Sequence, residues 1–168
     1  MSETTATSTT AASPSARQTG VLARVLREGY GPGAWHGPDL RAALESVTPA
    51  EALWRPGPGR HNIAEVAIHH AFYVRSVAGR LTGEEQPAFP FAGEDWFEVN
   101  DDRSFSWPKI TGLLEQLQER LVAAVGDIEG GQIQSPLSDT ERLDVVLGIT
   151  CHAVYHAGQI QLIKALRT

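Results

Sequence analysis

The segment His152-Ala-Val-Tyr-His156-Ala-Gly-Gln159 places two histidines four residues apart inside a long apolar stretch. On a helix, this spacing stacks both imidazole rings on one face, within reach of a single metal ion. Two such histidines on an exposed helix are ordinarily just solvated. Here the neighbouring residues are apolar, and burying two imidazoles without partners is costly. The segment therefore predicts either a bound metal ion or two well-satisfied core histidines.

We expect a helix over residues 140–166, with apolar side chains around most of its circumference, which is typical of a central, buried helix. One row of the helix contains Leu143, Val146, Leu147, Thr150, Val154, Ala157 and Gln161. The opposite row contains Val145, Ile149, His152, His156, Ile160 and Ile163. Because the two histidines share a row with aliphatic residues, we expect both to be buried.

The composition describes an ordinary soluble globular protein. The chain has 168 residues, 42% of them hydrophobic and 20% charged, with a formal net charge of −6. Its Lys and Arg residues are scattered, which argues against nucleic acid or an anionic membrane as a partner. The chain also lacks an apolar run of the roughly 18 residues that span a bilayer.

The single cysteine, Cys151, excludes an intrachain disulfide and a cysteine-based zinc site, and it suits a reducing, cytoplasmic location. Its neighbour His152 raises the alternative of a cysteine nucleophile. Adjacent helical residues diverge by about 100°, however, so we predict a small, buried apolar role for Cys151.

The pattern along the chain predicts one helical domain. Residues 1–15 are rich in Ser, Thr and Ala and are expected to form a disordered tail, so that residues 16–168 form the domain. Helices are predicted over residues 16–28, 39–47, 62–81, 109–125 and 140–166, with a loop around Trp54. The expected fold is all-α: a four-helix bundle with a broken first helix and long crossover loops.

The predicted helix over residues 62–81 carries specific signals at its ends. Asn62 is an expected N-cap, with Glu65 as its capping-box partner, and Gly83 is expected to end the helix. Residues 87–108 then form a long, acidic, aromatic connection. Such a loop is either functional or a lid whose rings only pack on the bundle. Asp101 and Asp102 in this loop are either a base or metal ligands, or a solvated pair of charges.

A third imidazole for a metal site would come from His69-His70, the one internal histidine pair on a facing helix. Helical periodicity favours His70, which falls at the centre of an apolar stripe, whereas His69 lies about 120° from that centre. His36 and His61 lie outside the expected helix interiors and are predicted to be exposed rather than ligands.

At these residues the sequence resembles the DinB-like superfamily, which includes the YfiT-type thiol transferases. The resemblance spans roughly residues 22–166, and two segments carry it: His61-Asn62-Ile63 leading to His69, and the stretch from His152 to Gln159. It implies a four-helix bundle that holds a divalent metal through one histidine of the second long helix and two of the last. The implied ligands are His69, His152 and His156. Position 61 holds His where many members have Trp.

In the resemblance, His70 occupies a position that is usually apolar. The resemblance therefore indicates His69 as the third ligand, whereas helical periodicity indicates His70. A three-histidine site leaves coordination positions open, and Zn, Ni or Fe(II) would suit it. The resemblance implies an enzyme that activates a low-molecular-weight thiol for transfer, or water for hydrolysis, on a small-molecule substrate, and it is compatible with a homodimer. Candidate partners for the ligand rings are Glu65, Tyr73, Tyr155 and Gln159.

No residue beyond the metal ligands is assigned a catalytic role from the sequence. One alternative to an enzyme is a non-catalytic bundle that binds a metal or a small ligand. Another is a structural protein with buried histidines.

Overall fold

The computed structural model describes residues 20–101 and 106–167, which contain six helices and no strand. The helices are α1 (Val21–Tyr30), α2 (Leu40–Leu44), α3 (Pro49–Ala52), α4 (Ile63–Thr82), α5 (Trp107–Glu129) and α6 (Asp139–Arg167). The all-α prediction is confirmed for this part of the chain. The predicted tail, residues 1–15, lies outside the described residues, and the domain boundary at residue 16 stays a prediction.

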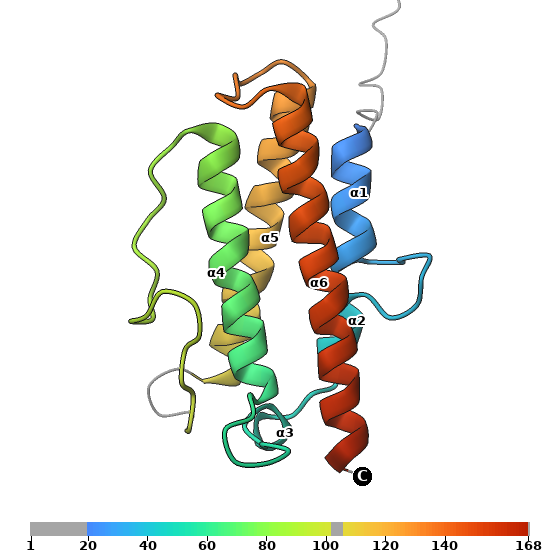
Figure 1. Ribbon diagram of the computed structural model, residues 1–168, viewed down its shortest axis with the longest axis vertical. Coiled ribbons are helices and arrows are strands. Elements are labelled where there is room, and N and C mark those ends of the chain that lie inside the picture. Colours follow the sequence, from blue (N-terminus) through green and yellow to red (C-terminus); the bar gives the residue numbers. More distant parts are fainter. Residues whose placement is uncertain (1–19, 102–105, 168) are drawn as a thin grey trace, which may run out of the picture.

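Four helices form the body of the molecule as a bundle (Figure 1). Helix α4 packs against α5 and α6, and α1 packs against the same two helices from the other side. In the view of Figure 1, α1 and α6 run downward, and α4 and α5 run upward. Because α4 and α5 are parallel neighbours, the connection after α4 must return along the outside of the bundle.

The first helix is interrupted as predicted, although at a different residue. The sequence predicted this helix over residues 16–28, but α1 continues to Tyr30 and ends at Gly31, whose φ is 98°. Gly29 lies so close to α6 that an added Cβ would meet the carbonyl oxygen of Thr150 at 2.8 Å. Glycine is therefore used inside this helix for a close approach of two backbones.

The short helices between α1 and α4 differ from the prediction. Helix α2 is shorter than the expected residues 39–47, and Asp39 is its N-cap, accepting a hydrogen bond from the Ala42 N–H at 2.9 Å. Helix α3 was predicted to be loop. Its capping box is complete, because Thr48 and Glu51 bond to each other's backbone N–H groups, and Pro49 occupies the first turn.

Helix α4 begins and ends where its sequence signals predicted. The Asn62 side chain accepts from the Glu65 N–H at 2.9 Å, and Gly83 ends the helix in the left-handed conformation, with φ 73°. The Glu65 carboxylate does not complete the predicted capping box, because it is bound elsewhere. Helix α5 begins at Trp107 rather than Lys109, since Pro108 is tolerated in a first turn.

The two predicted rows of α6 differ in how far they are buried. In the row predicted to contain both histidines, Val145, Ile149, His156, Ile160 and Ile163 are buried, as expected. His152 is only partly buried, which corrects the expectation that both histidines are buried. In the other row, three apolar side chains are 36–42% exposed, which corrects the prediction of a helix buried on most sides. They are Leu143, Leu147 and Val154. The same row also contains the buried Val146, Thr150 and Ala157, so the packing partners of α6 cover part of this row and leave the rest of it exposed. The homodimer stays a prediction.

In the described part of the chain, no helix is both long enough and apolar enough to cross a membrane.

Candidate metal site

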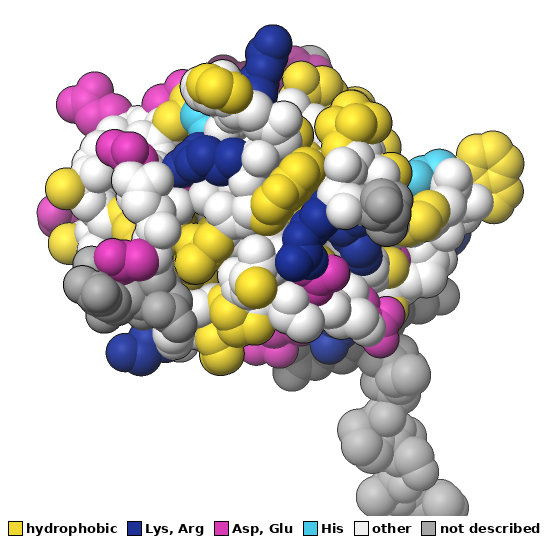
Figure 2. Space-filling view, turned by 90° about the horizontal axis from the view of Figure 1, so that it is seen from below, with side chains coloured by type: hydrophobic (Ala, Val, Ile, Leu, Met, Phe, Trp, Pro, Cys, Tyr) yellow, Lys and Arg dark blue, Asp and Glu magenta, His cyan; other side chains and the backbone are white. Residues whose placement is uncertain are grey.

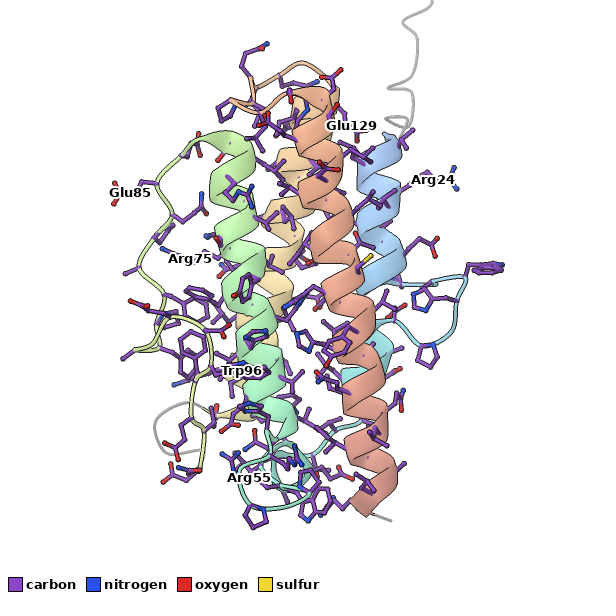
Figure 3. The ribbon with its side chains drawn as sticks, in the orientation of Figure 1. Arg24, Arg55, Arg75, Glu85, Trp96 and Glu129 are labelled. Atoms are coloured by element: carbon purple, nitrogen blue, oxygen red, sulfur yellow. The ribbon has the colours of Figure 1, made fainter. Side chains whose placement is uncertain are left out.

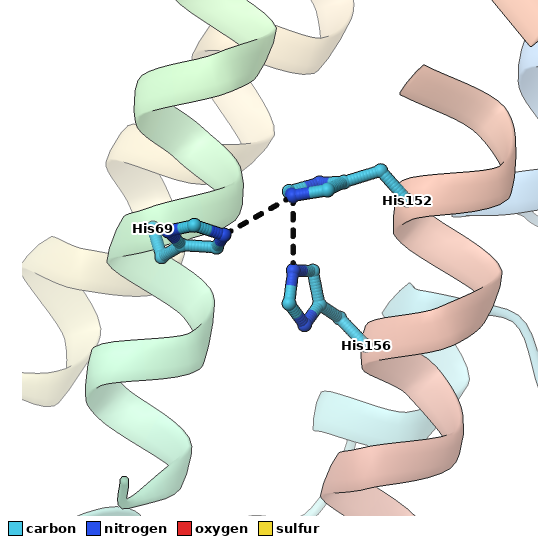
Figure 4. Close-up of side chains that lie close together, drawn as sticks. All are labelled: His69, His152 and His156. Atoms are coloured by element: carbon cyan, nitrogen blue, oxygen red, sulfur yellow. Dashed lines mark hydrogen bonds between the residues drawn. The ribbon is translucent and has the colours of Figure 1, made fainter. Parts of the chain in front are cut away.

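Three imidazole rings meet between helices α4 and α6 (Figure 4). The His152 Nε2 atom lies 3.1 Å from the Nε2 atoms of both His69 and His156. One ligand atom from each ring lies within 4.8 Å of the other two, and no other His, Cys, Asp or Glu of the described residues belongs to a group of this kind. The cluster combines the three histidines expected from the resemblance.

The remaining nitrogens of His69 and His156 face groups that accept hydrogen bonds. His69 Nδ1 lies 2.8 Å from the carbonyl oxygen of Asp95, which can only accept. His156 Nδ1 lies 2.6 Å from Oε1 of Gln159, whose amide nitrogen donates to the Tyr155 hydroxyl at 3.1 Å. Both rings therefore carry their proton on Nδ1 and direct an unprotonated Nε2 at the centre of the cluster.

This arrangement fits a metal ion. Two nitrogens that bind one tetrahedral zinc ion at about 2.05 Å lie about 3.3 Å apart, close to the 3.1 Å contacts made by His152. A proton on the Nε2 of His152 would satisfy the contacts only in part, because one N–H donates to only one of the two neighbouring Nε2 atoms. A cation at the centre would be bound by all three lone pairs.

Burial keeps the rings of His152 and His156 neutral, which is the form that binds metals. Burial, with the neighbouring His156 and His69, lowers the pKa of His152 to about 4. Burial also lowers the pKa of His156 to about 4, although the hydrogen bond that its Nδ1 donates to Gln159 Oε1 opposes this shift. At neutral pH both rings therefore present a lone pair without first losing a proton.

The connection after α4 covers the cluster from outside. The Trp96 ring stacks between the imidazole rings of His69 and His61. The ring centroids lie 3.9 Å apart for His69 and 3.7 Å apart for His61, with interplanar angles of 5° and 9°. The preceding residue, Asp95, bonds His69 through its carbonyl, and its carboxylate accepts from the Tyr73 hydroxyl at 3.1 Å. Figure 3 shows Trp96 beside α4. We expected this connection to be either functional or a packing lid, and it contacts a candidate ligand directly.

A buried acid holds the covering segment to α4. Glu65 is 2% exposed and accepts hydrogen bonds from the Arg55 guanidinium, His61 Nδ1 and the Val99 N–H. Burial alone would raise the pKa of Glu65, but these three donors lower it below its ordinary value. The sequence predicted that Glu65 would contact a ligand ring. Glu65 instead bonds the Val99 N–H and so holds the segment whose Asp95 and Trp96 contact His69.

His70 lies beside the cluster. Its Nδ1 is 2.8 Å from Nδ1 of His152, on the edge of that ring turned away from His69 and His156. Its Nε2 is buried and has no hydrogen-bond partner among the described residues. Periodicity correctly predicted that His70 is buried, and the resemblance selected the residue that joins the cluster.

The other candidates lie apart from the cluster. His36 is exposed, as predicted, and its Nε2 contacts the Glu28 carbonyl. Asp101 is exposed and outside the cluster, and Asp102 lies outside the described residues. Cys151 is exposed, which corrects its predicted buried role: it falls on the outer side of α6.

A pocket of about 560 Å³ opens beside the cluster, between the start of α4 and the end of α6. Its lining includes Trp96 and Gln159, which contact two of the clustered histidines. Arg60, Leu162 and Leu166 line it as well. Figure 2 views this end of the molecule, where Lys and Arg side chains lie among hydrophobic ones. The pocket therefore suits a small molecule with both apolar and anionic parts.

The model of the DinB superfamily matches residues 34–160, which is most of the chain and includes all three clustered histidines. No curated protein and no solved structure matches the sequence.

Proposed function

The chain belongs to the DinB superfamily, and we propose that it is a metal-dependent enzyme whose divalent ion is held by His69, His152 and His156. The observation that carries the proposal is the convergence of the three Nε2 atoms while each remaining ring nitrogen has a partner. Zinc, nickel and iron(II) all suit three imidazoles. When bound, the ion would supply Lewis-acid activation of a low-molecular-weight thiol or of water.

The chain's own residues position and shield the ligands. Asp95 and Gln159 hold the rings of His69 and His156 in the tautomer that leaves Nε2 free. Trp96 covers one face of His69 and limits the access of water there. These contacts act before any substrate arrives, so the donor set is preorganised.

The substrate we propose is a small molecule that enters the pocket beside the cluster. Leu162 and Leu166 would contact its apolar part, and the Arg60 guanidinium would contact an anionic group such as a carboxylate. Transfer of a low-molecular-weight thiol is the first reaction we would test, and hydrolysis is the second.

Elemental analysis tests the metal site directly. The protein is stripped with a chelator, reloaded separately with Zn²⁺, Ni²⁺ or Fe²⁺, and analysed beside H69A, H152A and H156A. We expect about one equivalent in the wild-type protein and clear loss in each variant. H36A is the matched control, because His36 is exposed and bonds only the Glu28 carbonyl. Stoichiometric metal in H69A would reject His69 as the third ligand.

Turnover is then measured on the loaded protein with a panel of small thiols and an electrophile, and with activated esters for hydrolysis. Activity that is lost in H152A and retained in H36A supports the enzyme. Stoichiometric metal without turnover of either kind would instead support the non-catalytic binding bundle.

A further inference from the structure

Each ring nitrogen that faces away from the cluster contacts another group, and for His152 this group is His70. The two Nδ1 atoms lie 2.8 Å apart, which is a hydrogen-bond distance and requires that one nitrogen donates and the other accepts. Two arrangements of the protons are therefore available, and they have opposite consequences for the cluster.

In the first arrangement, His70 donates to His152. His152 then carries its own proton on Nε2, the atom 3.1 Å from both His69 and His156. A protonated Nε2 is unable to bind a cation, so this arrangement suits only the protein without metal. In the second arrangement, His152 donates through Nδ1–H and its Nε2 is free. His70 must then carry its proton on Nε2, and each ring still holds one proton.

His70 is buried beside the cluster. It is 1% exposed, and its Nε2 has no hydrogen-bond partner among the described residues. A neutral imidazole has one nitrogen that accepts and one that donates. A ring in this state provides the acceptor that a ligand histidine needs on the side away from its metal.

We propose that His70 is a positioning residue of the metal site: its Nδ1 accepts the Nδ1–H of His152 and so keeps the Nε2 of His152 free for the cation. This inference rests on the proposed function, since it needs the metal. In this role His70 corresponds to the Asp95 carbonyl at His69 and to the Gln159 amide at His156. It also explains a buried histidine beside three others that joins no cluster of ligand atoms.

Asn and Leu have nearly the same shape, but only Asn offers an acceptor near the position of His Nδ1, so H70N and H70L form a matched pair. Zinc affinity is measured by competition with a chromophoric chelator at constant pH. We expect H70L to bind zinc about 10–100-fold more weakly than the wild type, and H70N to recover most of that loss. Urea unfolding measures the stability of the metal-free H70L and H70N proteins. If His70 had only a structural role, each variant would be destabilised to the same extent without metal as with zinc bound.

NMR spectroscopy of the ¹⁵N-labelled, zinc-loaded wild type gives a readout that needs no variant. A scalar coupling across the N–H···N bond between His152 Nδ1 and His70 Nδ1, with the proton assigned to His152, would support the proposal. A proton assigned to His70 Nδ1 would overturn it, as would equal zinc affinities for H70L and H70N. Failure of the wild type to bind zinc would instead overturn the metal site, and the role of His70 with it.

Discussion

Replacing Arg55 with Met should destabilise the protein strongly, because it leaves a buried carboxylate without its cation. Arg55 is bound to Glu65, whose side chain is 2% exposed while that of Arg55 is 29% exposed. Removing one partner of a buried ion pair costs about 3–5 kcal/mol. His61 and the Val99 N–H still donate to Glu65 in this variant, so we expect the lower end of that range, about 3 kcal/mol.

Urea unfolding of the metal-free protein measures this change without contribution from a ligand. For a chain of this size, each kcal/mol shifts Tm by about 2–4 °C, so thermal unfolding should fall by about 6–12 °C. Arg24→Met is the control: Arg24 is exposed on α1, and Figure 3 shows it directed away from the bundle. Its replacement should change the free energy of unfolding by no more than about 0.5 kcal/mol.

A double-mutant cycle separates the ion pair from the other contacts of Arg55. The combination of R55M with E65Q removes the buried charge as well as its partner. It should therefore cost less than the sum of the single changes, by about 0.5–3 kcal/mol. Additive effects, or a loss in R55M as small as that in R24M, would refute the view that this pair holds the covering segment.

Three further outcomes are expected. The metal-free protein should lose stability as the pH falls from about 6.5 to 4, because the pKa values of His152 and His156 are lowered to about 4 in the folded state and the unfolded chain binds protons first; urea titrations across this range measure the loss. Gly29→Ala should cost about 1–3 kcal/mol, since its Cβ would lie 2.8 Å from a backbone oxygen of α6, whereas Gly112→Ala, with open space around it, should stabilise α5 by up to about 1 kcal/mol. Leu121→Ala, at a side chain with 0% exposure, should cost about 2–5 kcal/mol in the same assay.

Periodicity predicted the helices well but not the direction in which each row of α6 faces. Both rows are apolar, so the pattern treated the whole helix as central. The row with His156 faces the bundle, whereas in the other row Val146 is buried while Leu143 and Leu147 remain exposed. Hydrophobicity alone does not distinguish a packed side from an uncovered one.

Periodicity did not predict that His69, rather than His70, joins the cluster, for a related reason. A helical wheel assumes a single buried direction, whereas α4 packs against both α5 and α6 and is covered by the segment that carries Trp96. Both histidines are therefore buried, and the one away from the stripe centre meets the α6 pair. The family motif identified it because the motif records position rather than burial.

Other parts of the site had no signal in the sequence. The group that fixes the tautomer of His69 is the backbone carbonyl of Asp95, and every residue has such a carbonyl. Its role depends on the path of an irregular segment, which side-chain patterns do not specify. By contrast, the missed helix α3 did have a signal, Thr48-Pro-Ala-Glu51, a capping-box pattern that we interpreted as a loop.

The hydrogen bond between His69 and the Asp95 carbonyl couples metal binding to the ordering of the segment between α4 and α5, residues 84–101. If ordering of this segment raises the metal affinity by some factor, then metal binding must raise the equilibrium constant for ordering of the segment by the same factor. Resistance to proteolysis, or slow amide exchange, over residues 84–101 would then titrate with free metal concentration. Protection of this segment would thus measure metal occupancy without any knowledge of the substrate.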